Sequence, residues 1–329
     1  MTLLKLVICV ALLICSEGVY AQKVGLLMDS YFIDRWYLDE KFIKERVTEL
    51  GGECVVEMPE GNPDEQVRLG KKLIESGIDV LVIIASDAKK AVEIVDMAEA
   101  RNIPVVAYDR VIASNNVDCY VSFNSLLVGK LQSLYATTKL PEGKYILING
   151  PLSDNNAVLF REGQLSRLQT SIDAGKVSLL ADLVLKDWNE LEAMMRLDSL
   201  FATSPQIPDV IIAGNDALAT GAIQALPVSR LGKVIVIRQD AEVLAIKNII
   251  KGHQTMTIYK PIKQLAYQAA EVALNLAKKQ PLPDFEKFRF GDIELKAILL
   301  NPVIVDKDNY ESTVIKDGHV KLDLPPKKR

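Results

Sequence analysis

Residues 80–109 read VLVIIASDAKKAVEIVDMAEARNIPVVAYD, and this stretch decides the fold. Two short apolar runs, Val80–Ala85 and Val105–Asp109, stand on either side of a charged segment of helical period, Ala88–Arg101. Short, almost continuously apolar runs are typical of parallel strands that are buried on both faces. The stretch therefore predicts a strand, a helix and a second strand, which is the repeating unit of a parallel α/β sheet.

The same rhythm continues toward both ends of the chain. In the first half, further strands are predicted at Lys23–Asp29, Glu53–Met58 and Cys119–Asn124, and a helix is predicted at Asp64–Ser76. In the second half, the predicted strands are Lys144–Asn149, Val177–Val184, Val210–Gly214 and Val234–Arg238, and the predicted helices are Asn156–Ala174, Glu190–Ala202, Ala217–Leu226 and Glu242–Lys251.

Two successive units of similar length predict an α/β fold with two doubly wound parallel-sheet lobes, each with helices on both faces of its sheet. The long helical segment Ile262–Lys279 follows the second unit, so the chain is expected to cross between the lobes more than once. Ligands of open α/β sheets bind at the carboxyl ends of the strands. The cleft between the two lobes is therefore the expected site.

The first 21 residues have the pattern of a secretory signal peptide. Lys5 precedes the apolar run Leu6–Ile14, and the small-residue site Val19-Tyr20-Ala21 predicts cleavage before Gln22. The apolar run is too short to span a bilayer. We therefore expect release into the periplasm. Lipid attachment at Cys15 is the less favoured alternative, because such sites usually have a small residue where this chain has isoleucine.

The composition argues against nucleic-acid binding and against most enzyme classes. The net charge is −4 with both signs interspersed, so there is no basic stripe for nucleic acid. His253 and His319 are the only histidines, which leaves no constellation for a catalytic triad or a zinc site, and no glycine-rich phosphate loop is present. We expect no enzyme, no metal and no cofactor, although Asp109 and Asp240 leave a carboxylate pair for glycoside hydrolysis conceivable.

Two cysteines, Cys54 and Cys119, remain after the predicted cleavage. An oxidising compartment would permit a disulfide. We expect both cysteines in separate strands near opposite edges of one sheet, where their Cα atoms cannot come within about 7 Å. Two buried free thiols are therefore predicted.

Polar residues end the predicted strands in both halves of the chain. Asp and Asn are also favoured helix caps and turn formers, and Asn155 and Asp216 are the best candidates for that role. Carboxylates, amides and guanidinium groups bridge neighbouring hydroxyls of a neutral sugar, and aromatic rings pack on its apolar faces. The candidate ligand-binding residues are Arg35, Trp36, Asp109, Arg110, Asp154, Asn156, Arg161, Trp188, Asn215, Asp240 and Lys260.

Several of these residues belong to stretches that resemble the periplasmic xylose-binding proteins of bacterial ABC transporters, within the type I periplasmic sugar-binding fold. The resemblance extends from Lys23 to about His319. Its most specific stretches are Arg35-Trp36, Val80–Ile84, Ala107–Arg110, Asp154–Asn156 with Leu159–Arg161, Gly221–Leu226 and Thr255–Pro261.

The resemblance implies a receptor that clamps one monosaccharide between its lobes, with the candidate residues as its ligands. It implies three interlobe crossings, expected near Phe123–Leu127, Tyr259–Ile262 and Asp292–Lys296. The expected domains are a signal peptide over residues 1–21, an N-terminal lobe over 22–125 plus 261–292, and a C-terminal lobe over 126–260 plus 293–329.

The implied partners are the sugar and an ABC permease at the membrane, with the protein itself a monomer. A sugar-sensing receptor that signals to a membrane kinase or a chemoreceptor is the alternative, since the same fold serves in sensors. A sugar-responsive repressor is disfavoured, because a signal peptide occupies the place of a DNA-binding motif.

The chain departs from the family pattern at one notable position. Arg238 stands where the family usually has a small residue before Gln-Asp, and strand alternation points it to the same side as Asp240. If its side chain reached the cleft, it would crowd one end of the sugar, so the choice between xylose and other monosaccharides stays open. Ser30 and Ser86-Asp87 also differ from the pattern expected near the cleft rim.

Overall fold

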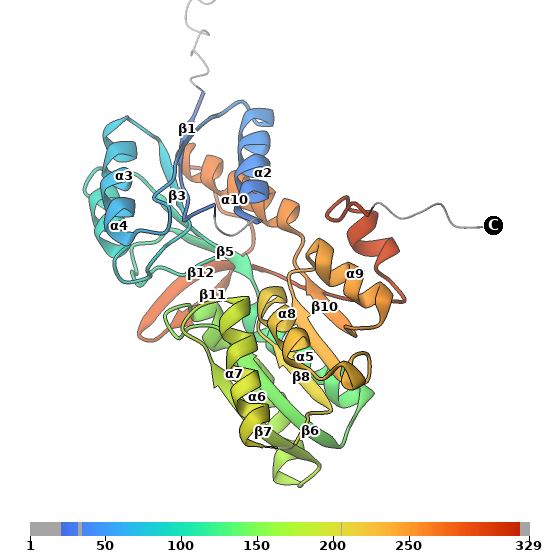
Figure 1. Ribbon diagram of the computed structural model, residues 1–329. Coiled ribbons are helices and arrows are strands. Elements are labelled where there is room, and N and C mark those ends of the chain that lie inside the picture. Colours follow the sequence, from blue (N-terminus) through green and yellow to red (C-terminus); the bar gives the residue numbers. More distant parts are fainter. Residues whose placement is uncertain (1–20, 32–34, 205, 323–329) are drawn as a thin grey trace, which may run out of the picture.

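The computed structural model describes residues 21–31, 35–204 and 206–322 and has two α/β lobes, one above the other in Figure 1. The predicted fold class is confirmed. The signal peptide expected over residues 1–21 and the alternative lipid site at Cys15 lie almost wholly outside the described residues, as does the end of the chain from residue 323.

The first lobe is built on a seven-stranded sheet. Its strands are β1 (Lys23–Leu27), β2 (Glu53–Glu57), β3 (Val80–Ile83), β4 (Val105–Tyr108), β5 (Cys119–Phe123), β11 (Glu286–Phe290) and β12 (Ile293–Leu300). They lie in the order β11-β12-β5-β4-β3-β1-β2, and every neighbouring pair is parallel except β11 with β12.

Helices cover both faces of this sheet. They are α2 (Arg35–Glu49) and α10 (Ile262–Ala277) on one face, and α3 (Pro63–Glu75) and α4 (Val92–Glu99) on the other. The sequence of β3 is wholly apolar because both of its faces are buried. Val80 and Val82 belong to the core under α2 and α10, whereas Leu81 and Ile83 belong to the core under α3 and α4. Alternate residues thus face different helices, and neither side meets water.

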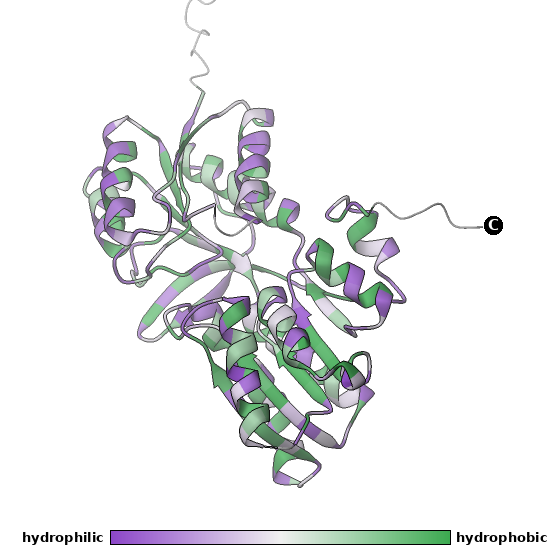
Figure 2. Ribbon diagram, in the orientation of Figure 1, coloured by the Kyte–Doolittle hydropathy of each residue, from purple (hydrophilic) through white to green (hydrophobic). Residues whose placement is uncertain are grey.

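The second lobe repeats the design on a six-stranded sheet. Its strands are β6 (Gly143–Asn149), β7 (Val177–Val184), β8 (Val210–Ala213), β9 (Ile235–Gln239), β10 (Met256–Tyr259) and β13 (Val303–Asp306), in the order β13-β10-β9-β8-β6-β7. Its helices are α5 (Ser125–Lys139), α6 (Asn155–Asp173), α7 (Glu190–Thr203), α8 (Asp216–Ala225) and α9 (Val243–Lys251). Figure 2 shows apolar strands inside the lobes and helices with mixed polar and apolar faces.

The chain passes between the two sheets three times in the described residues. The first passage lies at Asn124, between β5 and α5, and the second at Lys260-Pro261, between β10 and α10. The third was expected near Asp292–Lys296, and this was wrong. Because β12 pairs with β5 in the first sheet, the chain crosses only at Asn301-Pro302, and residues 293–300 belong to the first lobe instead of the second.

The two cysteines are free thiols, as predicted. Cys54 lies on the edge strand β2 and is only half-buried, so the expectation that both would be buried was wrong for it. Cys119 is buried on β5, which is an inner strand because β12 and β11 extend the sheet beyond it. Burial raises the pKa of the Cys54 thiol to about 12, so this thiol stays protonated at neutral pH.

Glycines allow the helices of the second lobe to touch backbone to backbone. A Cβ added at Gly129 of α5 would lie 2.0 Å from the carbonyl oxygen of Phe160 in α6. A Cβ added at Gly163 of α6 would lie 2.3 Å from the carbonyl oxygen of Leu126 in α5. The pair α5 and α6 can approach this closely only because both contact positions lack a side chain.

Gly129→Ala is therefore expected to destabilise the protein by about 1–3 kcal/mol, because the new methyl group overlaps a backbone that has little room to move. Gly143→Ala at the start of β6 is the control, since its Cβ would first meet the end of the Leu140 side chain, at 3.0 Å. Urea unfolding of both variants measures the difference. Equal stability of the two variants would contradict the proposed close contact.

Candidate functional site

A cavity of about 540 Å³ lies between the lobes, at the carboxyl ends of the strands of both sheets. This volume is within the range of small-molecule sites, about 300–1,000 Å³. Ten of the eleven residues predicted from the sequence line it, and Arg161 is the exception. We call this space the main cavity.

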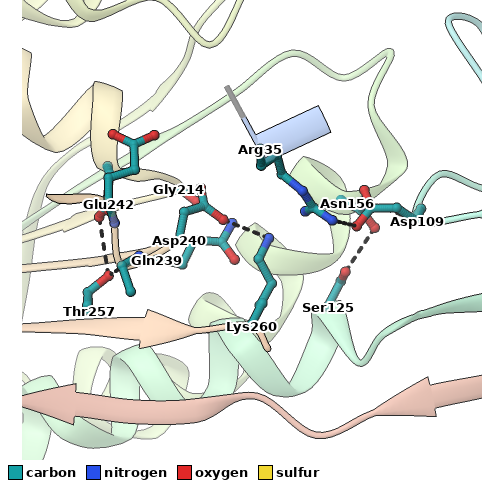
Figure 3. A network of polar contacts seen from close by, with 12 residues as sticks. Arg35, Asp109, Ser125, Asn156, Gly214, Gln239, Asp240, Glu242, Thr257 and Lys260 are labelled. Carbon is teal, nitrogen blue, oxygen red and sulfur yellow. Dashed lines mark hydrogen bonds and ion pairs between the residues drawn. The ribbon is translucent and has the colours of Figure 1, made fainter. Parts of the chain in front are cut away.

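The wall from the first lobe is organised around Arg35, the first residue of α2. Its Nη2 lies 3.1 Å from Asp109 Oδ1, and its Nε lies 3.2 Å from Asp39 Oδ2. Asp39 is fully buried and also accepts a hydrogen bond from the hydroxyl of Tyr108. Arg35 is thus held between two carboxylates, one inside the lobe and one at the cavity. Figure 3 shows its contact with Asp109.

Asp109 lies directly after β4 and has a left-handed backbone, with φ of 60°. Burial alone would raise the pKa of this carboxyl, but the positive charges of Arg35 and Lys260 more than offset it and the pKa falls below its usual value. The side chain therefore faces the cavity as an ionised hydrogen-bond acceptor.

Trp36 lines the main cavity, yet only 2% of it is exposed. The guanidinium carbon of Arg35 lies 4.4 Å from the centre of its ring, and that of Arg110 lies 5.7 Å away. An aromatic face attracts cations at this distance. In the open cavity the ring thus supports two arginines, where the sequence predicted a surface for a sugar face.

The wall from the second lobe centres on Asp240, which follows β9 with φ of 100°. Lys260 Nζ lies 2.8 Å from Asp240 Oδ1, and both side chains point toward each other in Figure 3. Asn215 caps helix α8, because its side-chain oxygen accepts a hydrogen bond of 2.9 Å from the Leu218 amide. Its capping role leaves the amide nitrogen at the cavity wall.

Asn156 connects the lobes beside the first crossing. Its Nδ2 donates to the carbonyl oxygen of Asp109 at 3.2 Å, and its Oδ1 accepts from Ser125 Oγ at 2.8 Å. Ser125 begins α5 immediately after the crossing residue Asn124. Asn156 therefore links a residue of the first lobe to the first crossing.

Among the aromatic residues predicted to bind the ligand, Trp188 is the one with an accessible ring. Two glycines leave the space that this ring occupies. Cβ atoms added at Gly150 and Gly214 would lie 2.5 Å and 2.9 Å from its ring. Its Nε1 donates to Asp154 Oδ2 at 3.1 Å, and the edge of Phe160 contacts it with ring centres 6.4 Å apart. The indole is thus fixed in position and half-buried at the cavity wall.

Arg161 is not brought to the main cavity in this conformation. It lies on α6, and its Nε donates to Asp182 Oδ1 of β7 at 2.9 Å. Its side chain is 38% exposed. Its predicted contact with the ligand therefore stays a prediction.

Arg238 does not enter the cleft either, although alternation places it on the same side of β9 as Asp240. It is completely buried under α8, where its Nε lies 2.9 Å from Asp216 Oδ1. Its Nη1 donates to the Asp216 carbonyl at 2.7 Å and to Thr220 Oγ1 at 3.0 Å. The side chain of Arg238 therefore does not crowd the cavity, because helix α8 covers this side of the strand.

The carboxylate of Asp216 extends this buried pair to two further segments. It accepts a hydrogen bond of 2.7 Å from the Glu242 amide and one of 3.2 Å from Thr257 Oγ1 of β10. Asn215 precedes Asp216, and Asp240 lies two residues from Glu242. One buried ion pair therefore fixes both backbone segments that present the polar wall of the second lobe.

Sequence reasoning missed several residues of the main cavity, among them Phe160, Gln239 and His319. Phe160 and Gln239 adjoin predicted residues and were within reach. No sequence pattern around His319 indicates that it lines the cavity, because it lies in the C-terminal segment, far along the chain from the predicted residues. Its Nε2 lies 3.3 Å from the Asp240 carbonyl oxygen, and its ring packs 4.7 Å from that of Tyr259.

No helix in the described ranges is long and apolar enough to cross a membrane. Within these same ranges, no cluster of three or more His, Cys, Asp or Glu side chains is arranged to hold a metal ion.

Comparison with known proteins gives a consistent assignment. The sequence matches the family described as periplasmic binding protein domain over residues 24–281. The D-xylose-binding periplasmic protein of Haemophilus influenzae is 37% identical over 94% of each chain, and that of Escherichia coli is 36% identical over 95% of this chain and 96% of its own. A carbohydrate transporter solute binding protein from Chloroflexus aurantiacus, solved with D-glucose, superposes with a TM-score of 0.84 at 26% identity and covers 93% of this chain and 100% of its own.

Asp216→Ala is expected to lower the free energy of unfolding by about 3–5 kcal/mol, because it leaves the buried guanidinium of Arg238 without its counter-charge. Urea unfolding measures the change. Glu294→Gln is the control: it removes an exposed ion pair with Lys287, 2.6 Å long, and should change stability little. A loss in Asp216→Ala no larger than in the control would contradict this role.

The pH dependence of stability should report His319. Burial of the imidazole lowers its pKa from the usual 6.5, and hydrogen bonds to the backbone of Asp240 and Ala241 offset this only in part. The unfolded chain then binds the proton at a higher pH than the folded protein, so stability is lost as the pH falls below about 6.5.

His319→Gln should therefore flatten the fall in unfolding free energy between about pH 7 and pH 5. Chemical unfolding at several pH values checks this, with His253→Gln as the control for the other histidine. If the slope of unfolding free energy against pH were unchanged in His319→Gln, this imidazole would not contribute to the pH dependence of stability.

Proposed function

The chain belongs to the periplasmic binding protein domain family, and from that premise we propose that it binds a neutral monosaccharide in the main cavity and delivers it to an ABC sugar transporter. D-xylose is the first candidate and related pentoses and hexoses follow, because two relatives over most of the chain are D-xylose-binding proteins.

One observation carries the proposal: charged groups of both lobes face one cavity as ion pairs. Asp109 with Arg35 lines one wall, and Asp240 with Lys260 lines the other. Ionised groups form stronger hydrogen bonds with hydroxyls than neutral groups do. Because each charge already has a counter-charge, an uncharged polyol suits the cavity better than an ion does.

Proposed contacts follow from the side chains that line the main cavity. Trp188 offers an indole face to the apolar side of the sugar ring, and Asp154 and Asn156 beside it offer acceptors and donors to the hydroxyls. Arg161 would join them only by leaving Asp182.

Lobe closure about the three crossings would complete the site. We expect the open form to bind sugar on one lobe and the second lobe to close over it, since hinge motions concentrate in such connecting segments. The closed form would then present both lobes to the permease. Export by the predicted signal peptide, a monomeric state and the absence of catalysis are parts of the same proposal.

Calorimetry with xylose, ribose, arabinose, glucose, galactose and fructose tests the function. Asp109→Ala should weaken binding of the best sugar about 100-fold, or about 3 kcal/mol, because the mutation removes an acceptor of the sugar hydroxyls and the carboxylate that pairs with Arg35 at the cavity. Asp284→Ala is the control, since this carboxylate is exposed and does not line the main cavity. Arg161→Ala should weaken binding as well if this residue turns to the ligand.

The outcome that would sink the proposal is the absence of binding for every sugar of the panel, or wild-type affinity in Asp109→Ala. Small-angle scattering during the same titration should show compaction of the protein. Recovery of the unchanged sugar after long incubation would separate binding from hydrolysis or isomerisation.

A further inference from the structure

A second cavity of about 530 Å³ adjoins the main cavity, and we call it the side chamber. Three residues border both spaces: Arg110, Asp154 and Trp188. Each space by itself reaches the size of a small-molecule pocket, about 300–1,000 Å³. One sugar ring in the main cavity therefore leaves the side chamber without an occupant.

The first lobe supplies one wall of the side chamber through the ends of β1 and β3. Asp29 is 5% exposed, and its Oδ2 lies 3.0 Å from Arg110 Nη1. Its Oδ1 accepts a hydrogen bond of 2.6 Å from Ser86 Oγ. The same wall includes the small residues Ala85 and Ala88, whose side chains do not fill the chamber.

The second lobe supplies the opposite wall through the loops after β6 and β7. Lys186, Asp187 and Asn189 stand on the β7–α7 loop, on either side of Trp188. Asn155 begins α6 and lines the same wall, as does the exposed Asn189. This wall therefore combines charged groups with side-chain amides.

The charges of the side chamber identify the ligand chemistry. Its charged lining residues are Asp29, Arg110, Asp154, Lys186 and Asp187, three acidic and two basic. This near balance does not favour a phosphate or a carboxylate. Carboxylates, amides and serine hydroxyls around an open space suit a second neutral polyhydroxy group.

We propose that the side chamber binds the second ring of a disaccharide whose first ring occupies the main cavity. This inference rests on the proposed sugar-binding function and extends it to a larger ligand class. The indole of Trp188 borders both rings, and its bond to Asp154 holds it in place between them. The protein is then a receptor for a disaccharide as well as for its monosaccharide unit.

Calorimetry of the full mature chain with xylose, glucose, xylobiose and cellobiose tests the inference. At least one disaccharide should bind with an affinity within about tenfold of its monosaccharide, or more tightly. Ala88→Phe, which fills the side chamber, should weaken that disaccharide by at least about tenfold and leave the monosaccharide unchanged. Lys89→Phe is the matched control, because the neighbouring side chain is exposed and does not line the chamber.

Ser86→Phe fills the same chamber from the adjacent position and replaces Ala88→Phe if thermal unfolding shows that the latter is misfolded. Binding of a monosaccharide without either disaccharide would overturn the inference and leave the proposed function intact. Disaccharide binding that neither filling variant weakens would overturn the placement in the side chamber. Failure of all four sugars to bind would remove the proposed function and this inference together.

Discussion

A charge taken out of water needs a counter-charge, and this constraint shapes both walls of the cleft. Asp109 lies against Arg35, Asp240 lies against Lys260, and Asp216 lies against Arg238. The strand ends can carry these ionised groups only because each group is paired. The charged groups at the cavity already have counter-charges within the protein. A ligand therefore has to replace water around ion pairs and not around isolated charges.

The two lobes meet this constraint in different ways. In the first lobe the buried partner is a carboxylate, Asp39, which holds the side chain of Arg35 toward the cavity. In the second lobe the buried pair of Arg238 and Asp216 fixes backbone, since Asp216 binds the Glu242 amide and lies next to Asn215. The first arrangement orients a guanidinium, whereas the second orients two loops.

The sequence predicted the parts of the fold that follow from burial on both faces. Continuous apolar runs such as Val80–Ala85 have no other stable place than the inside of a parallel sheet. The edge strand β11 was missed because its sequence, EKFRF, alternates and carries charges on its open side. Residues 293–300, which form β12, were assigned to the wrong lobe, because a short run contains no information on which of two sheets it joins. Residues at strand ends could be predicted as cavity residues, because the carboxyl ends of parallel strands lie at one edge of a sheet. The alternation of side chains along β9 could not show that α8 covers Arg238. Nor could the sequence show that His319, far along the chain, reaches Asp240.

The crossings between the lobes and the main cavity share residues. Lys260 lies in the second crossing and pairs with Asp240, and Asn156 joins Asp109 to Ser125 at the first crossing. The third crossing, Asn301-Pro302, carries no residue of the main cavity, and its proline restricts the backbone. The amide of Asn124 donates to the carbonyl of Leu300 at 3.0 Å, so a backbone hydrogen bond joins the first and third crossings. Lys260 and the contacts of Asn156 therefore bring the first two crossings to the wall of the main cavity, whereas the third crossing is connected to it only through the backbone of the first.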